Sequence, residues 1–207
     1  EVISTEYRDR FIRFDTKTGV LEAEAGVTLG QILELTVPKG WFLPVTPGTK
    51  FVSLAGAIAA DVHGKNHHHD GCFSQVVLNL TLQLESERQL NCSLDENADL
   101  FRATCGGMGL TGVILSASIQ LKPIESTWIK QRTIRTHNLA ETLKQFERHQ
   151  NSTYSVAWID CLSSGETLGR SLIMLGEHAA KDELGEKLSE QFKVHADPKL
   201  NVPLFTP

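Results

Sequence analysis

A short segment of the chain concentrates the side chains best suited to chemistry. His63, Lys65 and His67 to His69 lie close together, and Gly64 separates the first imidazole from the first ammonium group. An imidazole donates a hydrogen bond or transfers a proton near neutral pH. An ammonium group neutralises a phosphate or a developing oxyanion. Because glycine permits a sharp turn, we expect His63 and Lys65 to face the same side of a ligand.

The same segment allows a second interpretation, a zinc site. The nearby acidic and thiol groups are Asp61, Asp70 and Cys72. Zinc requires three or four ligands that converge at about 2 Å. The spacing of His63 and His67 suits a helix, but Gly64 disfavours a continuous helix and the HExxH pattern is absent from the sequence. We therefore expect no metal, and a zinc-dependent hydrolase built on His63 to His69 stays open as an alternative.

Two segments of small residues flank this chemistry, SLAGAIAAD at 53–61 and CGGMGLTG at 105–112. Such residues fill little volume, but they let a backbone closely approach another backbone, a flat ligand or a diphosphate at a helix start. The glycine loop follows a predicted helix rather than a strand, so it is not the dinucleotide-binding fingerprint. We expect the two segments to form two walls of one ligand cleft. Ahead of them, Pro47-Gly48 suits a type II turn with positive φ at Gly48.

The elements that must position these residues follow from periodicity. The first part of the chain predicts a hairpin over 11–26, a helix from its N-cap Thr28 to Pro38, and a hairpin of strands 76–84 and 89–93. In the strand 76–84, alternation places Val76, Leu78, Leu80, Leu82 and Leu84 on one face. A short helix ending at Gly106 and a strand ending at Pro123 follow.

The pattern changes near 124–127, where we expect a domain boundary. Strands are predicted over 127–136, 154–161 and 170–178, and an amphipathic helix over 138–150. The mixture of hairpins and interspersed helices indicates an α+β fold. We expect residues 1–125 and 126–207 to form two separate units.

Composition excludes several classes of protein. The 207 residues, 41% of them hydrophobic, suffice for one large or two small domains, and the net charge of -5 provides no basic footprint for nucleic acid. No apolar run reaches the length of a bilayer span. The four cysteines, Cys72, Cys92, Cys105 and Cys161, are scattered as reduced thiols usually are, which favours a cytoplasmic location. The strand-like opening and linker-like end indicate an internal portion of a longer protein.

The segments LPVTPGTKFVSLAGAIAADVHGKNHHHDGCFSQVV and DLFRATCGGMGLTGVI together resemble the FAD-linked oxidases of the vanillyl-alcohol oxidase type. Within this family the chain looks most like the oxidases of lipid-linked sugars, and the aldonolactone oxidases share a looser version of the pattern. The resemblance runs from about Gly19 to Gly169. It implies the second part of a PCMH-type FAD-binding domain, followed by the start of an α+β substrate-binding domain. The family usually has Gly-Gly where this chain has Ala55-Gly56.

The resemblance also implies roles for individual residues. The residues implied to contact FAD, held without a covalent bond, are Gly48, Thr49, Ser53, Leu54, Ala55, Gly56, Ala60, Asp61, Val62, His63 and Ile114. Lys65 and Trp158 are implied to contact the substrate, and His63 and Lys65 are the catalytic candidates.

The resemblance implies an FAD-dependent oxidoreductase. Its reaction would oxidise a secondary alcohol of a sugar or sugar derivative, phosphorylated and lipid-linked sugars included, to a ketone by hydride transfer to flavin. Besides the zinc hydrolase, a ligand-binding module without catalysis is the other alternative. The residues leave the exact substrate and the electron acceptor open.

Overall fold

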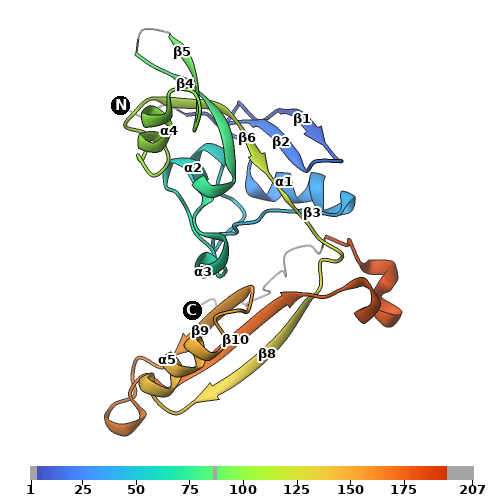
Figure 1. Cartoon of the computed structure of the whole chain (residues 1–207), viewed down its shortest axis with the longest axis vertical. Coiled ribbons are helices and arrows are strands. Elements are labelled where there is room, and N and C mark those ends of the chain that lie inside the picture. Colours follow the sequence, from blue (N-terminus) through green and yellow to red (C-terminus); the bar gives the residue numbers. More distant parts are fainter. Residues whose placement is uncertain (1–3, 86–87, 195–207) are drawn as a thin grey trace, which may run out of the picture.

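The computed structural model describes residues 4–85 and 88–194, and its main elements are two antiparallel sheets, one in the upper and one in the lower part of Figure 1. The upper sheet has the strand order β1-β2-β6-β4-β5, and the lower sheet has the order β8-β10-β9. Helices are short and interspersed among the strands, so the α+β class is confirmed. Along the sequence, the last strand of the upper sheet ends at Gln120, and the first strand of the lower sheet begins at Ile129.

The upper sheet is built from two hairpins that flank a central strand. Its strands are β1 (Phe11–Asp15), β2 (Val20–Glu24), β4 (Val77–Gln83), β5 (Gln89–Ser93) and β6 (Val113–Gln120). The first hairpin turns where Asp15 accepts a hydrogen bond from the Lys17 N–H at 2.9 Å and Gly19 adopts a φ of 74°. Both predicted hairpins are confirmed, because β2 pairs with β1 and β5 pairs with β4.

Helices close one side of the upper sheet over a continuous apolar core. They are α1 (Leu29–Thr36), α2 (Leu54–Ala59), α3 (His67–Asp70) and α4 (Ala98–Thr104), with 3-10 turns at Val37–Lys39 and Phe73–Val76. The predicted N-cap Thr28 forms a full capping box with Gln31. The largest fully buried side chains of this core include Leu21, Ile32, Leu54, Phe73 and Ile119.

The lower sheet carries a helix on one face only. Its strands are β8 (Ile129–Thr136), β9 (Tyr154–Ile159) and β10 (Ser171–His178). Helix α5 (Leu139–Arg148) packs on β8 and β10, where the Thr136 and Thr142 hydroxyls bond at 2.7 Å. Further 3-10 turns cover Gly165–Thr167, Lys181–Glu183 and Gly185–Glu190. The face opposite α5 is free to form one wall of a cavity.

A small two-stranded sheet lies where the chain passes from the upper to the lower part. Strand β3 (Trp41–Phe42) pairs with β7 (Lys122–Pro123). The Ile124 N–H also donates to the Gly40 carbonyl at 2.9 Å. These bonds tie the end of the upper unit to the chain segment that leads into the lower sheet.

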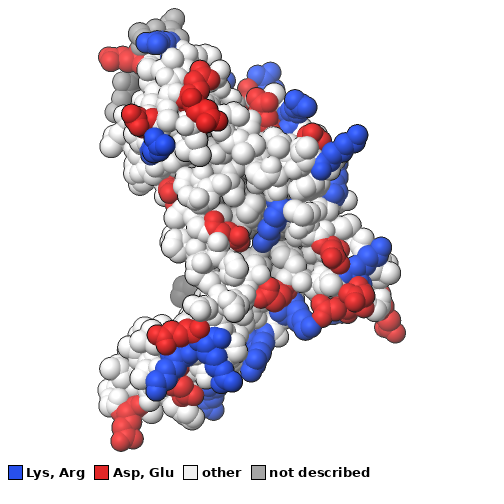
Figure 2. All heavy atoms as spheres, viewed as in Figure 1, with Lys and Arg blue, Asp and Glu red and all other residues white. Residues whose placement is uncertain are grey.

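Charges are mixed over the surface. On the face shown in Figure 2, basic and acidic side chains are interspersed on both the upper and the lower part. Among the helices of the described residues, none is both long and apolar enough to cross a bilayer.

Two local predictions were wrong. The strand β4 does not alternate regularly, because its pairing with β6 shifts register between Val77 and Asn79. Val77 and Leu80 are therefore buried, whereas Leu78 is 43% exposed. Gly48 has a φ outside the positive range, so Pro47-Gly48 does not form a type II turn.

The register shift makes a prediction about two leucines of the same strand. We expect Leu80→Ala, at a position that is 1% exposed, to lower the free energy of unfolding by about 2–5 kcal/mol, because it leaves a cavity. The same change at Leu78 should cost less than about 1 kcal/mol. Urea unfolding followed by circular dichroism measures both, and equal losses would contradict the observed register.

Candidate active site

The corner that carries His63 and Lys65 is shaped by close backbone contact. A Cβ atom added at Gly64 would lie 2.6 Å from the Thr46 carbonyl oxygen and 3.1 Å from the Thr46 nitrogen. The φ of Gly64 lies outside the positive range. Glycine is therefore needed here for space rather than for a left-handed backbone conformation.

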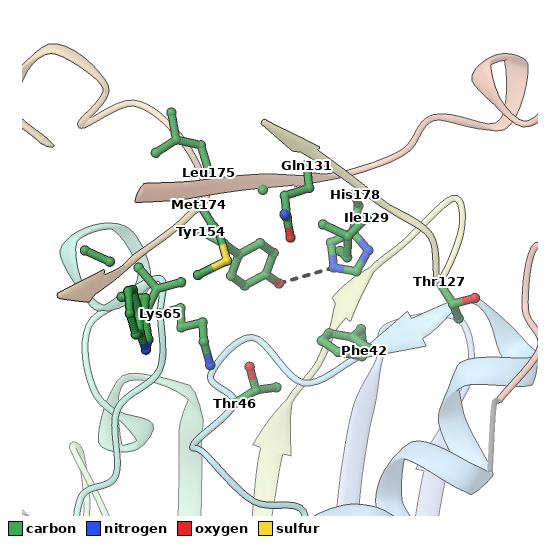
Figure 3. Close-up of a pocket in the computed structure, with 14 residues that line it drawn as sticks. Phe42, Thr46, Lys65, Thr127, Ile129, Gln131, Tyr154, Met174, Leu175 and His178 are labelled. Atoms are coloured by element: carbon green, nitrogen blue, oxygen red, sulfur yellow. Dashed lines mark hydrogen bonds between the residues drawn. The ribbon is translucent and has the colours of Figure 1, made fainter. Parts of the chain in front are cut away.

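A buried asparagine holds this corner in place. Asn66 is fully buried, and its side-chain N–H groups donate to the Pro44 carbonyl at 2.5 Å and to the Asp70 carboxylate. The backbone carbonyl of Asn66 accepts hydrogen bonds from the N–H groups of His69 and Asp70, each at 2.8 Å. These bonds start the short helix α3. Lys65 is left exposed at the surface, and its ammonium group ends near Thr46 (Figure 3).

A cavity of about 510 Å³ lies between the two sheets. Phe42, Thr46 and Lys65 line it from the upper unit. The strands β8, β9 and β10 supply most of the opposite wall, with the side chains of Ile129, Gln131, Tyr154, Val156, Trp158, Met174 and His178. The register places Ile129 opposite His178 and Val156 opposite Met174, so these residues share the sheet face that α5 leaves open.

Two hydrogen bonds join the corner that carries His63 and Lys65 to strand β9 and the turn just before it. The Ser155 N–H donates to the Lys65 carbonyl at 2.9 Å. The His68 Nε2 lies 2.8 Å from the Ser152 carbonyl oxygen. His68, which the sequence pattern left without a role, therefore fastens one unit to the other.

One end of the cavity contains a chain of polar groups. The Tyr154 hydroxyl lies 3.2 Å from His178 Nε2 (Figure 3). Lys122, which does not line the cavity itself, donates from its ammonium group to the same hydroxyl at 2.7 Å. Burial is the main cause that lowers the pKa of Lys122 and of His178 and raises the pKa of Tyr154. Phe42 packs edge-on against His178, with ring centroids 5.2 Å apart.

The two small-residue segments meet in a second hollow. The Gly106 N–H donates to the Ile58 carbonyl at 3.0 Å, and the Met108 N–H donates to the Ala59 carbonyl at 2.8 Å. A groove of about 350 Å³ runs beside these contacts, lined by Thr5, Ser53, Ala55, Gly56, Ala59, Gly109, Gly112, Val113 and Ile114. Because most of these side chains are small, the backbone of both segments is accessible from the groove.

The first N–H groups of α2 are used within the protein. The N–H groups of Leu54 and Ala55 donate to the carbonyls of Val27 and Ala25, at 2.7 and 3.0 Å. The Gly56 N–H donates to the Ser53 hydroxyl at 3.2 Å. A diphosphate held by these three amides, one of the options that the sequence left open, does not fit this arrangement.

The structure separates the predicted residues into groups. Ser53, Ala55, Gly56 and Ile114 line the groove, and Lys65 and Trp158 line the cavity between the sheets. Leu54 lines neither hollow with its side chain, which is fully buried in the core.

The remaining predicted residues line neither hollow. Gly48, Thr49 and Ala60 are exposed, and Val62 packs against the core. The Asp61 carboxylate accepts bonds from the Ser74 N–H at 2.8 Å and the Ser74 hydroxyl at 3.1 Å. His63 is exposed and packs edge-on against His67, with ring centroids 5.3 Å apart. Its role near a flavin stays a prediction.

The histidine segment gives no support to a zinc centre. Over residues 4–85 and 88–194, no group of three or more His, Cys, Asp or Glu side chains is placed to hold a metal ion. The rings of His68 and His69 instead contact each other edge-on at 5.6 Å.

Sequence reasoning missed the polar end of the cavity. Tyr154 and His178 were assigned only to strands, and Lys122 only to the end of one. No local motif marks them, because each comes from a different strand and they meet only when the lower sheet folds over the upper unit. The only sequence feature that could have indicated this polar group was the presence of Tyr154 and His178 in predicted strands.

The first part of the chain matches a known domain family. Residues 1–93 match the FAD binding domain family. This match, together with the relatives described next, supports FAD as the cofactor.

The most informative relatives are oxidases and a reductase. The chain is 37% identical over 210 residues to the decaprenylphosphoryl-beta-D-ribose oxidase of Mycolicibacterium smegmatis, covering 100% of this chain and 46% of that protein. It is 33% identical over 111 residues to the D-arabinono-1,4-lactone oxidase of Yarrowia lipolytica, covering 54% of this chain and 21% of that protein. It is 30% identical over 121 residues to the human Delta(24)-sterol reductase, covering 58% and 23% respectively. The chain thus spans about half or less of the length of these relatives.

The contact at Gly64 predicts a strong dependence on residue size. We expect Gly64→Ala to lower the free energy of unfolding by about 1–3 kcal/mol, because its Cβ overlaps the backbone of Thr46. Gly48→Ala is the matched control, since a Cβ there meets nothing within 4 Å, and it should stay within about 0.5 kcal/mol of the parent. Thermal unfolding separates the two variants, and an unaffected Gly64→Ala protein would show that the corner is not tightly packed.

Proposed function

We propose that this protein is an FAD-dependent oxidoreductase that oxidises a secondary alcohol of a sugar or sugar derivative to a ketone. The observation that carries the proposal is the cavity of about 510 Å³ between the upper unit and the open face of the lower sheet. It lies next to an FAD binding domain and presents one ammonium group, several hydroxyl or amide groups and an apolar wall. This combination suits a small polyol with an apolar or charged substituent.

The residues present fit an FAD molecule. The groove lined by Ser53, Gly56 and Gly109 admits the extended part of the cofactor, because little side-chain volume obstructs it. A Cβ at Gly109 would meet no atom within 4 Å, so the groove is open at this point. When bound, FAD supplies the hydride acceptor. The protein's own residues bind the alcohol, orient it and receive its proton.

Lys65 is the residue best placed to act on the substrate. The backbone carbonyl of Lys65 accepts a hydrogen bond from the Ser155 N–H, which fixes the backbone at this residue. The Lys65 side chain lines the cavity from this fixed position. A positive charge at this position stabilises a phosphate or a developing alkoxide. Trp158, which is 64% exposed and lies on the facing strand, supplies a flat apolar surface for a sugar ring. His63 is a further candidate for proton handling.

The relatives make the substrate class more specific. The names of two of them state oxidation of a ribose derivative and of an arabinonolactone. In this proposal, residues 1–125 form part of the FAD-binding domain and residues 126–207 begin the substrate-binding domain. The cavity then lies where the two domains meet, as substrate sites often do.

Substitution of Lys65 tests the proposal. In the intact protein with FAD bound, anaerobic addition of β-D-ribofuranosyl phosphate should bleach the visible absorption of the flavin. We expect Lys65→Ala to reduce the second-order rate of bleaching by about 10- to 1000-fold, as loss of a charged transition-state contact does. Lys144→Ala, an exposed change on α5, is the matched control.

Two outcomes would count against this function. If Lys65→Ala changed neither the rate nor the affinity, Lys65 would have no role in the reaction. If the intact protein bound FAD but no sugar alcohol bleached it, the sugar oxidase proposal would be wrong.

A further inference from the structure

We propose that the Tyr154 hydroxyl is a binding group that accepts a hydrogen bond from one hydroxyl of the ligand in the cavity between the two sheets. The inference rests on the proposed function and specifies how the cavity selects its ligand. Tyr154 selects a hydrogen-bond donor at this position, and Lys122 and His178 act as positioning residues that impose this selection.

The direction of the hydrogen-bond chain begins at a backbone carbonyl. His178 Nδ1 lies 3.0 Å from the Ser126 carbonyl oxygen. A carbonyl oxygen only accepts, so Nδ1 must carry the proton. In the neutral imidazole, Nε2 is then the acceptor. The Tyr154 hydroxyl, 3.2 Å from Nε2, must therefore donate its single proton to His178.

The other neighbour of the hydroxyl is a cation. The Lys122 ammonium group has three N–H donors and no acceptor, so at 2.7 Å it donates to the Tyr154 oxygen. Its Nζ also lies 4.9 Å from the centroid of the Tyr154 ring, a cation-π contact that holds the ring in the same place. The hydroxyl proton and one of the lone pairs of the oxygen are thus both committed within the protein.

One hydrogen-bonding position of the Tyr154 oxygen is left, and it can only accept. Tyr154 lines the cavity, and its hydroxyl end points toward His178 along the cavity wall (Figure 3). A ligand hydroxyl can donate into this position. A ligand carbonyl, ether or fluorine at the same point would meet a lone pair, and a polar group left unpaired in a partly buried site is costly. The cavity therefore distinguishes an alcohol from its ketone at this point.

The ionisation of the three groups is consistent with this assignment. Burial raises the pKa of Tyr154, and the carboxylates of Asp70 and Glu177 raise it further, so the phenol stays protonated. Burial lowers the pKa of His178, and the charge of Lys122 lowers it further, so the imidazole stays neutral at neutral pH. Burial also lowers the pKa of Lys122, but Asp70 and Glu177 oppose this effect.

A cycle of ligand and protein changes tests the acceptor role. The intact protein, with its FAD reduced in advance and air excluded so that no turnover occurs, is titrated calorimetrically with β-D-ribofuranosyl phosphate. The titration is repeated with analogues in which one hydroxyl at a time is replaced by hydrogen or by fluorine. We expect one position to be selective, so that both replacements there weaken binding about 10-fold.

The variant Tyr154→Phe should then lose the discrimination at that position alone. Its affinity for the parent sugar should fall about 10-fold, while its affinities for the two analogues stay unchanged, which is the coupling expected of a direct contact. Tyr7→Phe, the same change at a side chain that is 90% exposed, should behave as the unmodified protein.

The outcomes separate this inference from the proposed function. Bleaching of the flavin by the sugar, without coupling between Tyr154 and any ligand hydroxyl, overturns the acceptor role and leaves the oxidase standing. A fluorine analogue that binds as well as the parent at the coupled position also overturns it, because Tyr154 would then be donating. A protein that holds FAD but neither binds nor is bleached by any of the sugars overturns both.

The pH dependence gives a second readout that a merely structural tyrosine would not show. The charged or titratable groups around His178 are Lys122, Tyr154 and Glu177, with Asp70 acting on Lys122 and Tyr154. The pKa of His178 is lowered from its ordinary value of 6.5, so the ring gains its second proton only below that pH. Nε2 then donates, the Tyr154 O–H turns toward the cavity, and the discrimination against the fluorine analogue should shrink. From pH 7.5 down to pH 6.5 the discrimination should stay constant, because His178 stays neutral there, and a discrimination that shrinks within this range would contradict the assigned chain.

Discussion

The hydrogen bond between the Ser155 N–H and the Lys65 carbonyl, 2.9 Å long, is the contact on which the candidate site depends. It joins the first residues of β9 to the corner of the upper unit, and so it places the open face of the lower sheet over the Lys65 side chain. A backbone bond is suited to this task because its strength does not depend on which side chains line the cavity. The bond between His68 and Ser152 fastens the same two segments a second time.

That contact is useful only because the corner itself is rigid. Gly64 lies against the backbone of Thr46 with no room for a Cβ atom, and Asn66 binds the carbonyl of Pro44 from a fully buried position. Both contacts connect the histidine segment to the chain just after β3, about twenty residues earlier. The lysine therefore starts from a fixed backbone, which lowers the entropic cost of holding its charge at one point of the cavity.

The two hollows differ in their chemistry. The groove beside α2 contains small residues whose N–H groups are largely used within the fold, so it offers shape and little charge. The cavity between the sheets contains an ammonium group and a directed chain of hydrogen bonds through Tyr154 and His178. A cofactor that supplies the oxidising chemistry needs the first kind of site, and a polyol that must be oriented needs the second.

Local sequence was sufficient to predict most of the secondary-structure elements. The capping box at Thr28, the two hairpins of the upper sheet and all three strands of the lower sheet follow from side-chain periodicity and turn residues, which act over a few positions. The motif order also predicted FAD, which the family match supports, and it drew attention to Lys65, which lines the cavity between the sheets. Only the tertiary structure decided that Leu78 is exposed, that Gly64 is required by the approach of Thr46, and that Lys122, Tyr154 and His178 form one chain. The physical reason is that these features depend on register and on contacts between distant segments, and such contacts leave no periodic or local signal in a single sequence.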